Sequence, residues 1–317
     1  MKGNFARLLD TVPHVNDFLT ITLNLNIATF VPLKKKPASF DINSSIVLCE
    51  KGVLDGIEHP TKTSKNFRDI LYASDIAREG LQLQIVNELF TKSLLKNDEK
   101  IVLGKGGAMP VKPIKKKKAF ILIGLPASGK SKVATQISNK FGAVILDSDF
   151  AKRKLPEYIQ YPWGASLVNS ESSKIIFGTP EGKFLSLYER VVDAKYNVVI
   201  PKVGAEPEDI IPYCENLNLL GYEVHLTLVY LPKEKSTIRA LSRYIDTNRY
   251  VPLTLIFDVF GDNPALTYFK LKNNKPSFIS SFGIINTDVP RNGDFICSDF
   301  LGNNPARIYS LKKNVLI

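Results

Sequence analysis

Residues 124–131, GLPASGKS, combine two glycines, a lysine and a hydroxyl at the spacing G-x-x-x-x-G-K-[ST]. Small residues at this spacing let backbone N–H groups turn inward around a phosphate. Lys130 can then reach the β- and γ-phosphates, and the Ser131 hydroxyl can ligate Mg²⁺. We therefore expect ATP and Mg²⁺ as cofactors, held by Gly124, Leu125, Pro126, Ala127, Ser128, Gly129, Lys130, Ser131 and Lys132.

The residues around this motif have the sequence patterns that a phosphate-binding loop requires. AFILIG before it is a continuous apolar run, typical of a buried strand, and KSKVATQISNKFG after it is amphipathic and ends at a glycine. A helix that starts at the phosphate adds its positive N-terminal end. The order strand, glycine-rich turn, helix predicts a nucleotide site, whereas the motif without this context would be weak.

Two acids follow the next apolar run, in ILDSDFAKRKLPEY. Asp147 and Asp149 lie two residues apart, so on an extended strand end they are expected to share one face. The carboxyl ends of parallel strands are where such sheets bind ligands. One acid could help to hold Mg²⁺ through water, and the other could accept a proton from an attacking hydroxyl. The alternative is that an aspartate only caps a helix beginning at FAKRKL.

Arginines are grouped in STIRALSRYIDTNRYVP. Arg239 and Arg243 are one helical turn apart, and Arg249 follows in a turn-like stretch. Phosphoryl transfer places negative charge on the γ-phosphate oxygens, and arginines from a mobile segment can stabilise that charge and exclude water. The alternative is a basic helix face that is exposed to solvent.

Strand and helix patterns alternate after residue 116, which predicts an α/β fold with a parallel sheet and helices on both faces. The predicted strands are AFILIG, AVILDSD, NVVIPKVG and EVHLTLVYLP, and the predicted helices between and after them are KSKVATQISNKFG, GKFLSLYERVVDAKY, EPEDIIPYCENLNLLGY and KEKSTIRALSRYID.

Residues 102–120 contain three glycines, two prolines and a run of four lysines, a composition typical of a linker. We place a domain boundary near residue 115, with an N-terminal domain at 1–115 and a kinase-like domain at 116–317. Alternating apolar residues at 17–33 predict strands. Residues 64–97 have helical spacing, in two pieces broken near Gly80. The N-terminal domain is therefore expected to be smaller and α+β.

The formal net charge of +11 and the pI of about 9.3 favour an acidic partner such as a nucleotide, a nucleic acid or an anionic membrane surface. The three cysteines are far apart and form no C-x-x-C pair, which argues against a zinc site and a disulfide framework. No leader peptide and no apolar run of the roughly 18 residues of a membrane span is expected, so we predict a cytoplasmic protein.

The motifs GLPASGKS, ILDSDFAKRKLPEY, WGASLVNSESSKI and NVVIPKVG, followed by the arginine stretch, resemble the zeta toxin family over residues 118–272. The resemblance implies a P-loop kinase with a shikimate- or nucleotide-kinase-like sheet. The best-known members phosphorylate UDP-N-acetylglucosamine on its sugar, and members are usually held by an antitoxin that blocks the nucleotide site. The resemblance implies nothing about residues 1–115.

Carried over by position, Lys130 and Ser131 keep their phosphate and Mg²⁺ roles, and Asp149 matches the family's proposed base. Glu171 of SESS matches an acid that contacts substrate, and Asp147 is expected beside the substrate and the Mg²⁺. Arg243 and Arg249 match two lid arginines around the γ-phosphate. Many members have an acid where this sequence has Pro201, and GTPEGKFLSLYER resembles an extension in the substrate region.

Three functions fit these residues. The first is a kinase whose acceptor is a small-molecule hydroxyl, with UDP-N-acetylglucosamine as the expected case. The second is a polynucleotide or nucleotide kinase, which the basic charge makes credible. The third is an ATP- or GTP-binding switch without catalysis, against which the paired acids and the arginines argue. An antitoxin-like partner, or restraint of the kinase by the N-terminal region in the same chain, is expected with the first.

Overall fold

The structure is a computed structural model that describes residues 7–310 except 31, 33–35, 38, 181 and 291–292. The chain divides into two compact units. The helical unit comprises Met1–Gly107, Ser148–Glu189 and Thr237–Val259, and the sheet unit comprises Ala108–Asp147, Arg190–Ser236 and Phe260–Ile317. Each unit is described separately below.

The sheet unit contains a six-stranded sheet in the order β2-β3-β1-β4-β5-β6. All neighbouring pairs are parallel except β5 with β6, which is antiparallel. β1 and β4 are almost entirely buried along their length, as continuous apolar runs in parallel sheets are. The strand bounds are β1 Lys118–Ile123, β2 Val144–Ile145, β3 Val198–Lys202, β4 Glu223–Tyr230, β5 Ser281–Asn286 and β6 Ile296–Phe300.

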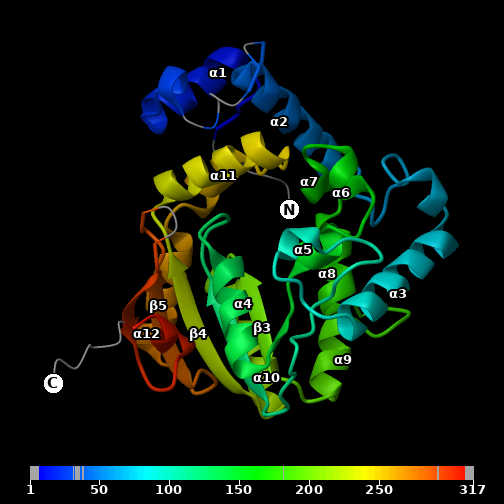
Figure 1. Cartoon of the computed structure of the whole chain (residues 1–317), viewed down its shortest axis with the longest axis vertical. Helices are drawn as coiled ribbons and strands as arrows, with labels where there is room; N and C mark the ends of the chain where they lie inside the picture. The colour runs from blue at the N-terminus through cyan, green and yellow to red at the C-terminus, as the bar shows by residue number, and fades with distance from the viewer. Residues whose placement is uncertain are drawn as a thin grey trace. The chain divides into compact units, whose positions relative to one another are not determined.

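Helices cover this sheet, as Figure 1 shows for α4, which lies in front of the strands. α4 (Lys130–Phe141) packs on β1, β2 and β3, while α10 (Ile211–Leu219) and α12 (Asn263–Asn274) pack on β4. α9 (Leu187–Asp193) and α11 (Lys233–Thr247) complete the predicted helices. The predicted α/β fold is confirmed; α12, β5 and β6 were not anticipated.

The helical unit has no strand in its described residues, and an isolated β-bridge joins Val102 and Lys105. The α-helices that lie wholly inside this unit are α1 Val12–Asp17, α2 Ile42–Glu58, α3 Asp75–Thr91, α5 Ser148–Lys152, α6 Glu157–Gln160, α7 Gly164–Leu167 and α8 Asn169–Phe177. Short 3-10 or π turns lie at Phe18–Thr22, Ile27–Thr29, Ile70–Tyr72 and Asp98–Lys100, with another at Leu255–Phe260.

The strands expected at residues 17–33 are wrong for the part that the structure describes. Thr11 accepts a hydrogen bond from the His14 N–H at the start of α1, and the helical path continues through a π turn to Thr22. The buried side chains Val15, Phe18 and Leu19 recur at spacings of three and four, so a helical path places them on one face. The expected α+β character of the N-terminal region is corrected to helical.

The predicted helical segment at 64–97 is present, but it is not broken at Gly80. α3 starts after Ser74, whose hydroxyl accepts the Ala77 N–H, and runs without interruption to Thr91. A Cβ at Gly80 would meet nothing within 4 Å, so the glycine lies on an open helix face. A glycine in such a position lowers helix stability without ending the helix.

The glycine- and lysine-rich stretch that suggested a linker is packed over its first half. The Gly104 N–H donates to the Glu88 carboxylate at 2.9 and 3.1 Å, and Lys154 Nζ donates to Val102 O at 2.8 Å. A Cβ at Gly107 would lie 2.2 Å from the carbonyl oxygen of Lys92. Gly107 therefore serves close packing, Gly104 adopts a φ of +82°, and the compact units do not follow the boundary expected near residue 115.

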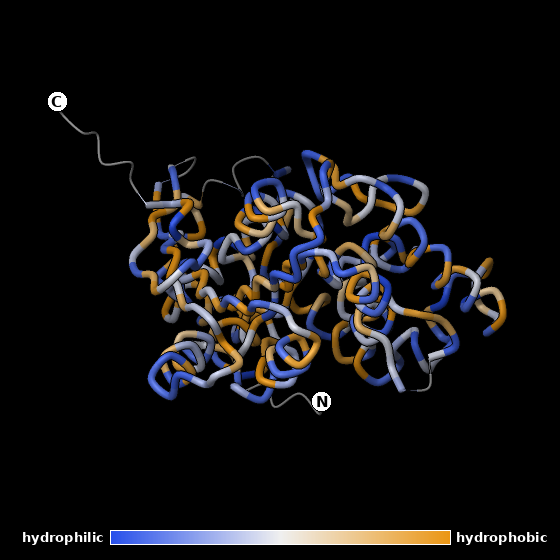
Figure 2. The backbone as a smooth tube through the Cα atoms, turned by 90° about the horizontal axis from the view of Figure 1, so that it is seen from below, coloured by the Kyte–Doolittle hydropathy of each residue, from blue (hydrophilic) through white to orange (hydrophobic). Residues whose placement is uncertain are grey.

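Hydrophobic residues occur in short stretches interrupted by hydrophilic ones along the whole trace (Figure 2). Among the described residues, no helix combines the length and the apolar character needed to cross a membrane.

Candidate functional site

The phosphate-binding motif forms a tight loop between β1 and α4 in the sheet unit. Gly124 and Gly129 have φ of +154° and +94°, and Ala127 has φ of +62°. A Cβ at Gly124 would lie 2.4 Å from the Val229 carbonyl oxygen, so a side chain there would collide with β4. α4 begins at Lys130, directly after Gly129, and points its N-terminal end at the loop. The predicted strand–loop–helix arrangement is present.

Lys130 reaches back over this loop. Its Nζ donates to the carbonyl oxygens of Gly124 and Leu125 at 2.6 Å each. The loop is held from outside, because Thr287 Oγ1 donates to Ser128 O at 2.7 Å and Ser236 Oγ donates to Pro126 O. The Ser128 hydroxyl is buried and has no hydrogen-bond partner among the described residues. The loop thus combines the Lys130 ammonium with a buried Ser128 hydroxyl, and both groups could donate hydrogen bonds to the phosphates of a nucleotide.

A lysine that the sequence did not single out lies at the same edge of the sheet. Lys202 ends β3 and pairs in register with Ile123, the last residue of β1 before the loop. Its Nζ donates to the Tyr213 hydroxyl at 3.1 Å and lies 4.3 Å from that ring's centroid. Burial lowers the pKa of Lys202 to about 8, and the charges of Asp147 and Asp209 oppose this shift. Asp147 thus faces a cation at the carboxyl edge.

The expectation that Asp147 and Asp149 share a strand face is wrong. β2 contains only Val144 and Ile145, and α5 begins at Ser148, so Asp149 lies in the first turn of a helix. A helix does start at this point, at Ser148 and so two residues earlier than the FAKRKL helix of the alternative. The two acids also belong to different units, Asp147 to the sheet unit and Asp149 to the helical unit.

Asp149 forms the centre of a charged cluster within the helical unit. Arg249 Nη2 lies 2.5 Å from Asp149 Oδ2, and Lys152 Nζ lies 3.2 Å from Oδ1. Burial raises the pKa of Asp149, but the charges of Arg249, Lys152 and Arg153 outweigh this effect and hold it well below its usual value. The carboxylate is therefore ionised at neutral pH.

Arg243 adds a second guanidinium to this cluster. Burial lowers the pKa of Arg243, the nearby charge of Arg249 lowers it further, and Asp149 and Tyr158 oppose both. Arg243 Nε is buried without a hydrogen-bond partner in the described part of the chain. The Arg249 guanidinium lies 5.3 Å from the centre of the Tyr158 ring. The structure thus brings Asp149, Arg243 and Arg249 together, with an excess of positive charge that would attract an anion.

Glu171 lies in another place in the helical unit, fully buried on α8. Both of its oxygens accept hydrogen bonds from Arg78, and Thr61 and Gln82 donate to it at 2.6 Å each. Burial raises the pKa of Glu171, but the bonds from Arg78 outweigh it and lower the pKa. In this arrangement Glu171 has no surface to offer a substrate. Arg78 was missed because nothing in its local sequence points to a partner on α8.

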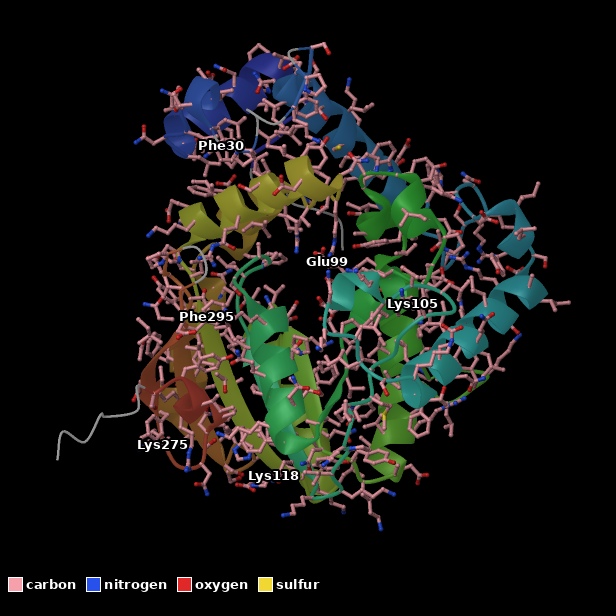
Figure 3. The ribbon with its side chains drawn as sticks, in the orientation of Figure 1. Phe30, Glu99, Lys105, Lys118, Lys275 and Phe295 are labelled. Atoms are coloured by element: carbon pink, nitrogen blue, oxygen red, sulfur yellow. The ribbon has the colours of Figure 1, made fainter. Side chains whose placement is uncertain are left out.

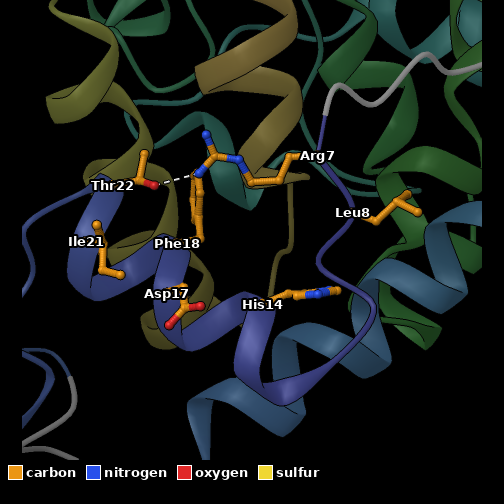
Figure 4. A pocket seen from close by; sticks show the side chains of 7 residues that line it. All are labelled: Arg7, Leu8, His14, Asp17, Phe18, Ile21 and Thr22. Carbon is orange, nitrogen blue, oxygen red and sulfur yellow. Dashed lines mark hydrogen bonds between the residues drawn. The ribbon is translucent and has the colours of Figure 1, made fainter.

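A hollow in the helical unit contains none of these residues. It has a volume of about 420 Å³ beside α1, and Arg7 Nη1 donates to Thr22 Oγ1 across it (Figure 4). Its lining residues are Arg7, Leu8, His14, Asp17, Phe18, Ile21 and Thr22. No sequence motif relates these residues to phosphate chemistry.

A model of the zeta toxin family matches residues 105–265, which is half of the chain. This chain belongs to the zeta toxin family. The phosphate loop, Asp149, Glu171, Arg243 and Arg249 all lie in the matched span. Residues before 105, together with β5 and β6, lie outside it.

Relatives agree with this membership. The chain is 26% identical over 163 residues to a zeta toxin of Enterococcus hirae and 24% identical over 164 residues to one of Streptococcus pyogenes. In both cases the match covers 51% of this chain and 54% of the relative. The chain therefore spans about half the length of the curated zeta toxins it matches.

A solved structure supports the fold. It is a chain from the PezAT chromosomal toxin–antitoxin system of Streptococcus pneumoniae, with 16% sequence identity and a TM-score of 0.52. The match covers 77% of this zeta toxin family member and 89% of the other chain, so it extends beyond the residues that the family model matches.

Proposed function

We propose that this protein is an ATP-dependent kinase of the zeta toxin type that transfers the γ-phosphate to a hydroxyl group of a small molecule. The observation that carries the proposal is the phosphate loop itself, with Lys130 Nζ 2.6 Å from the carbonyl oxygens of Gly124 and Leu125 at the N-terminus of α4. Membership of the family supports the same activity. UDP-N-acetylglucosamine is the acceptor we propose first.

Each proposed role follows from the surroundings of the residue. ATP supplies the phosphoryl group, and the loop amides and Lys130 bind its β- and γ-phosphates. Ser131 is proposed to ligate Mg²⁺, which spreads the charge of these phosphates, and Asp147 to hold that ion through water. The described residues contain no group of three or more His, Cys, Asp or Glu side chains that could hold a metal ion.

Asp149 is proposed as the group that accepts the acceptor's proton. Its lowered pKa makes it a weak base, but phosphoryl transfer passes through a loose transition state in which proton transfer can come late. Arg249 holds the carboxylate ionised and oriented. Arg243 and Arg249 are proposed to stabilise the negative charge of the transferring group.

The N-terminal region is proposed to restrain this activity in the same chain. Thr61, Arg78 and Gln82 all bind Glu171, the acid that the family resemblance assigns to substrate. As long as these bonds persist, Glu171 is not available to an acceptor. An antitoxin-like protein is a further proposed partner, supported by the likeness to a chain from a toxin–antitoxin system.

The test is transfer of labelled γ-phosphate from ATP to three acceptor preparations: UDP-N-acetylglucosamine, an oligonucleotide with a 5′-hydroxyl, and a mixture of cell metabolites. Transfer to the sugar nucleotide that Lys130→Ala abolishes supports the proposal. Transfer only to the oligonucleotide supports a polynucleotide kinase. The net charge of +11 is consistent with that alternative, because positive charge favours binding of a phosphate backbone. If the protein bound ATP but transferred phosphate to no acceptor, the third alternative, a nucleotide-binding switch without catalysis, would be favoured.

A further inference from the structure

An aromatic ring lies directly against the phosphate loop in the sheet unit. A Cβ built on Gly129 would lie 3.1 Å from Phe295 Cζ, so the ring touches the loop just before α4 (Figure 3). Lys132 Nζ lies 4.4 Å from the centroid of the same ring, and the Tyr309 ring is centred 6.0 Å away. Phe295 is only half-buried, so part of its ring remains accessible.

The direction of a nucleotide on such a loop is set by the loop's own chemistry. The lysine reaches the β- and γ-phosphates, the helix N-terminus receives the β-phosphate, and the α-phosphate follows it along the first helical residues. A ribose and base must therefore leave the loop near Lys132, the second residue after Lys130. The ring of Phe295 lies at that point.

The chain directly after β5, which leads toward Phe295, is anchored to the loop. Thr287, just after β5, donates from its hydroxyl to Ser128 O at 2.7 Å and to Tyr230 O at 3.0 Å. Lys235 clamps the next residue, Asp288, at 2.7 and 2.8 Å from its two carboxylate oxygens. The start of the connection from β5 to β6 is thus fixed beside the phosphate loop.

We propose that Phe295 is the surface on which the nucleobase of the bound nucleotide stacks. The inference rests on the proposed nucleotide site and adds a base-binding position outside the span that the family model matches. A phenyl ring offers no hydrogen bonds, so it accepts the face of adenine and of guanine alike. Stacking of a base on an aromatic side chain changes affinity by about 5- to 150-fold.

The experiment measures binding of ATP, GTP and inorganic tripolyphosphate to the full chain by calorimetry. Phe295→Ala is expected to weaken ATP and GTP about equally, by about tenfold or more, and to leave tripolyphosphate unchanged. Phe295→Trp should retain nucleotide affinity, and in a Trp163→Phe background its fluorescence should be quenched by ATP but not by tripolyphosphate. Lys130→Ala is the matched control and should weaken all three ligands.

Unchanged ATP affinity in Phe295→Ala would overturn the stacking role while leaving the nucleotide proposal intact. Equal weakening of ATP and tripolyphosphate would also overturn it, because Phe295 would then only shape the loop. If the wild-type chain bound neither ATP nor tripolyphosphate, the proposed function would fail and the base site with it. Selective loss of the two nucleotides, with the fluorescence response in the tryptophan variant, supports the proposal.

Discussion

Arg78 and Glu171 form a buried bidentate ion pair, with Nε 2.7 Å from Oε1 and Nη2 2.7 Å from Oε2. The same guanidinium binds Glu157 at 2.7 and 3.1 Å, so one cation serves two buried carboxylates. Amide and hydroxyl donors complete the shell, including the Asp69 N–H at 2.8 Å from Glu157. The cluster joins α3, α6 and α8 inside the helical unit.

Arg78→Met should destabilise the helical unit by about 3–5 kcal/mol, because it leaves two carboxylates buried without their cation. The control is Lys183→Met, which breaks the exposed pair with Glu79, whose side chains are 72% and 39% exposed. That change should cost at most about 1 kcal/mol. Urea unfolding compares the two variants. Similar midpoint concentrations of urea would contradict the large contribution to stability that we assign to Arg78.

Lys130→Ala should abolish nucleotide-dependent activity while leaving the fold intact. Its ammonium lies over the phosphate loop and donates to the Gly124 and Leu125 carbonyl oxygens, so we expect the loss to fall on phosphate binding. Lys140→Ala, at the exposed far end of the same helix, is the matched control and should be neutral. Turnover near the wild-type level in Lys130→Ala would remove the phosphate-loop assignment.

Asp149→Asn should keep ATP binding and lose phosphoryl transfer by about 10²-fold or more. Because the folded pKa of Asp149 lies well below 3.8, the carboxylate stays charged above that pH, and any activity loss between pH 5 and 7 must come from another group. Asp147→Asn should do less unless Asp147 holds the Mg²⁺. If expression of the wild type is toxic, Asp149→Asn should relieve it, and undiminished transfer would exclude Asp149 as the base.

Arg243→Ala and Arg249→Ala should each lower kcat, by up to about 10³-fold, with little change in the Kd for ATP. Charge that appears mainly in the transition state is stabilised there and not in the bound ground state. Arg243→Lys keeps the positive charge but loses the planar guanidinium, so its kcat should lie between that of the wild type and that of Arg243→Ala. A parallel loss of ATP affinity and kcat in both alanine variants would assign these arginines to ground-state binding instead.

Glu50→Gln should flatten the pH dependence of stability in the helical unit. Burial raises the pKa of Glu50 to about 7, although the Tyr250 hydroxyl donates to its carboxylate. The unfolded chain loses this proton near pH 4.5 and the folded chain near pH 7, so the wild type loses stability as pH rises through this window, by about 3 kcal/mol. Thermal unfolding at several pH values measures it, and an equally steep decline in Glu50→Gln would refute the assignment.

The phosphate loop and the strands around it could be predicted because their signals are local. The apolar run at 118–123, the glycines at 124 and 129 and the helix from Lys130 follow one another closely along the chain, and the two glycines supply the positive φ values that the turn requires. Even the lysine's reach over the loop follows from its place five or six residues after the carbonyls it contacts.

The sequence predicted the secondary structure of short segments less accurately. β2 has two residues, too few for the period of a strand to place Asp149, and the helix that begins at Ser148 prevailed. The apolar residues at 17–33 fit a strand in isolation, but burying Val15, Phe18 and Leu19 together required a helical path. The glycines at 104 and 107 resembled a linker, whereas Gly104 adopts a φ of +82° and Gly107 admits the Lys92 carbonyl at close range.

The chain's own sequence therefore determined the phosphate-loop motif, the parallel sheet and the identity of the charged residues proposed for catalysis. Only the tertiary structure decided that Arg78 takes both oxygens of Glu171, that Lys202 lies level with the end of β1, and that Phe295 covers Gly129. The physical reason is distance along the chain. These contacts join residues about 80 to 170 positions apart, and such pairs are selected by packing and charge compensation, which leave no periodic signal in the sequence.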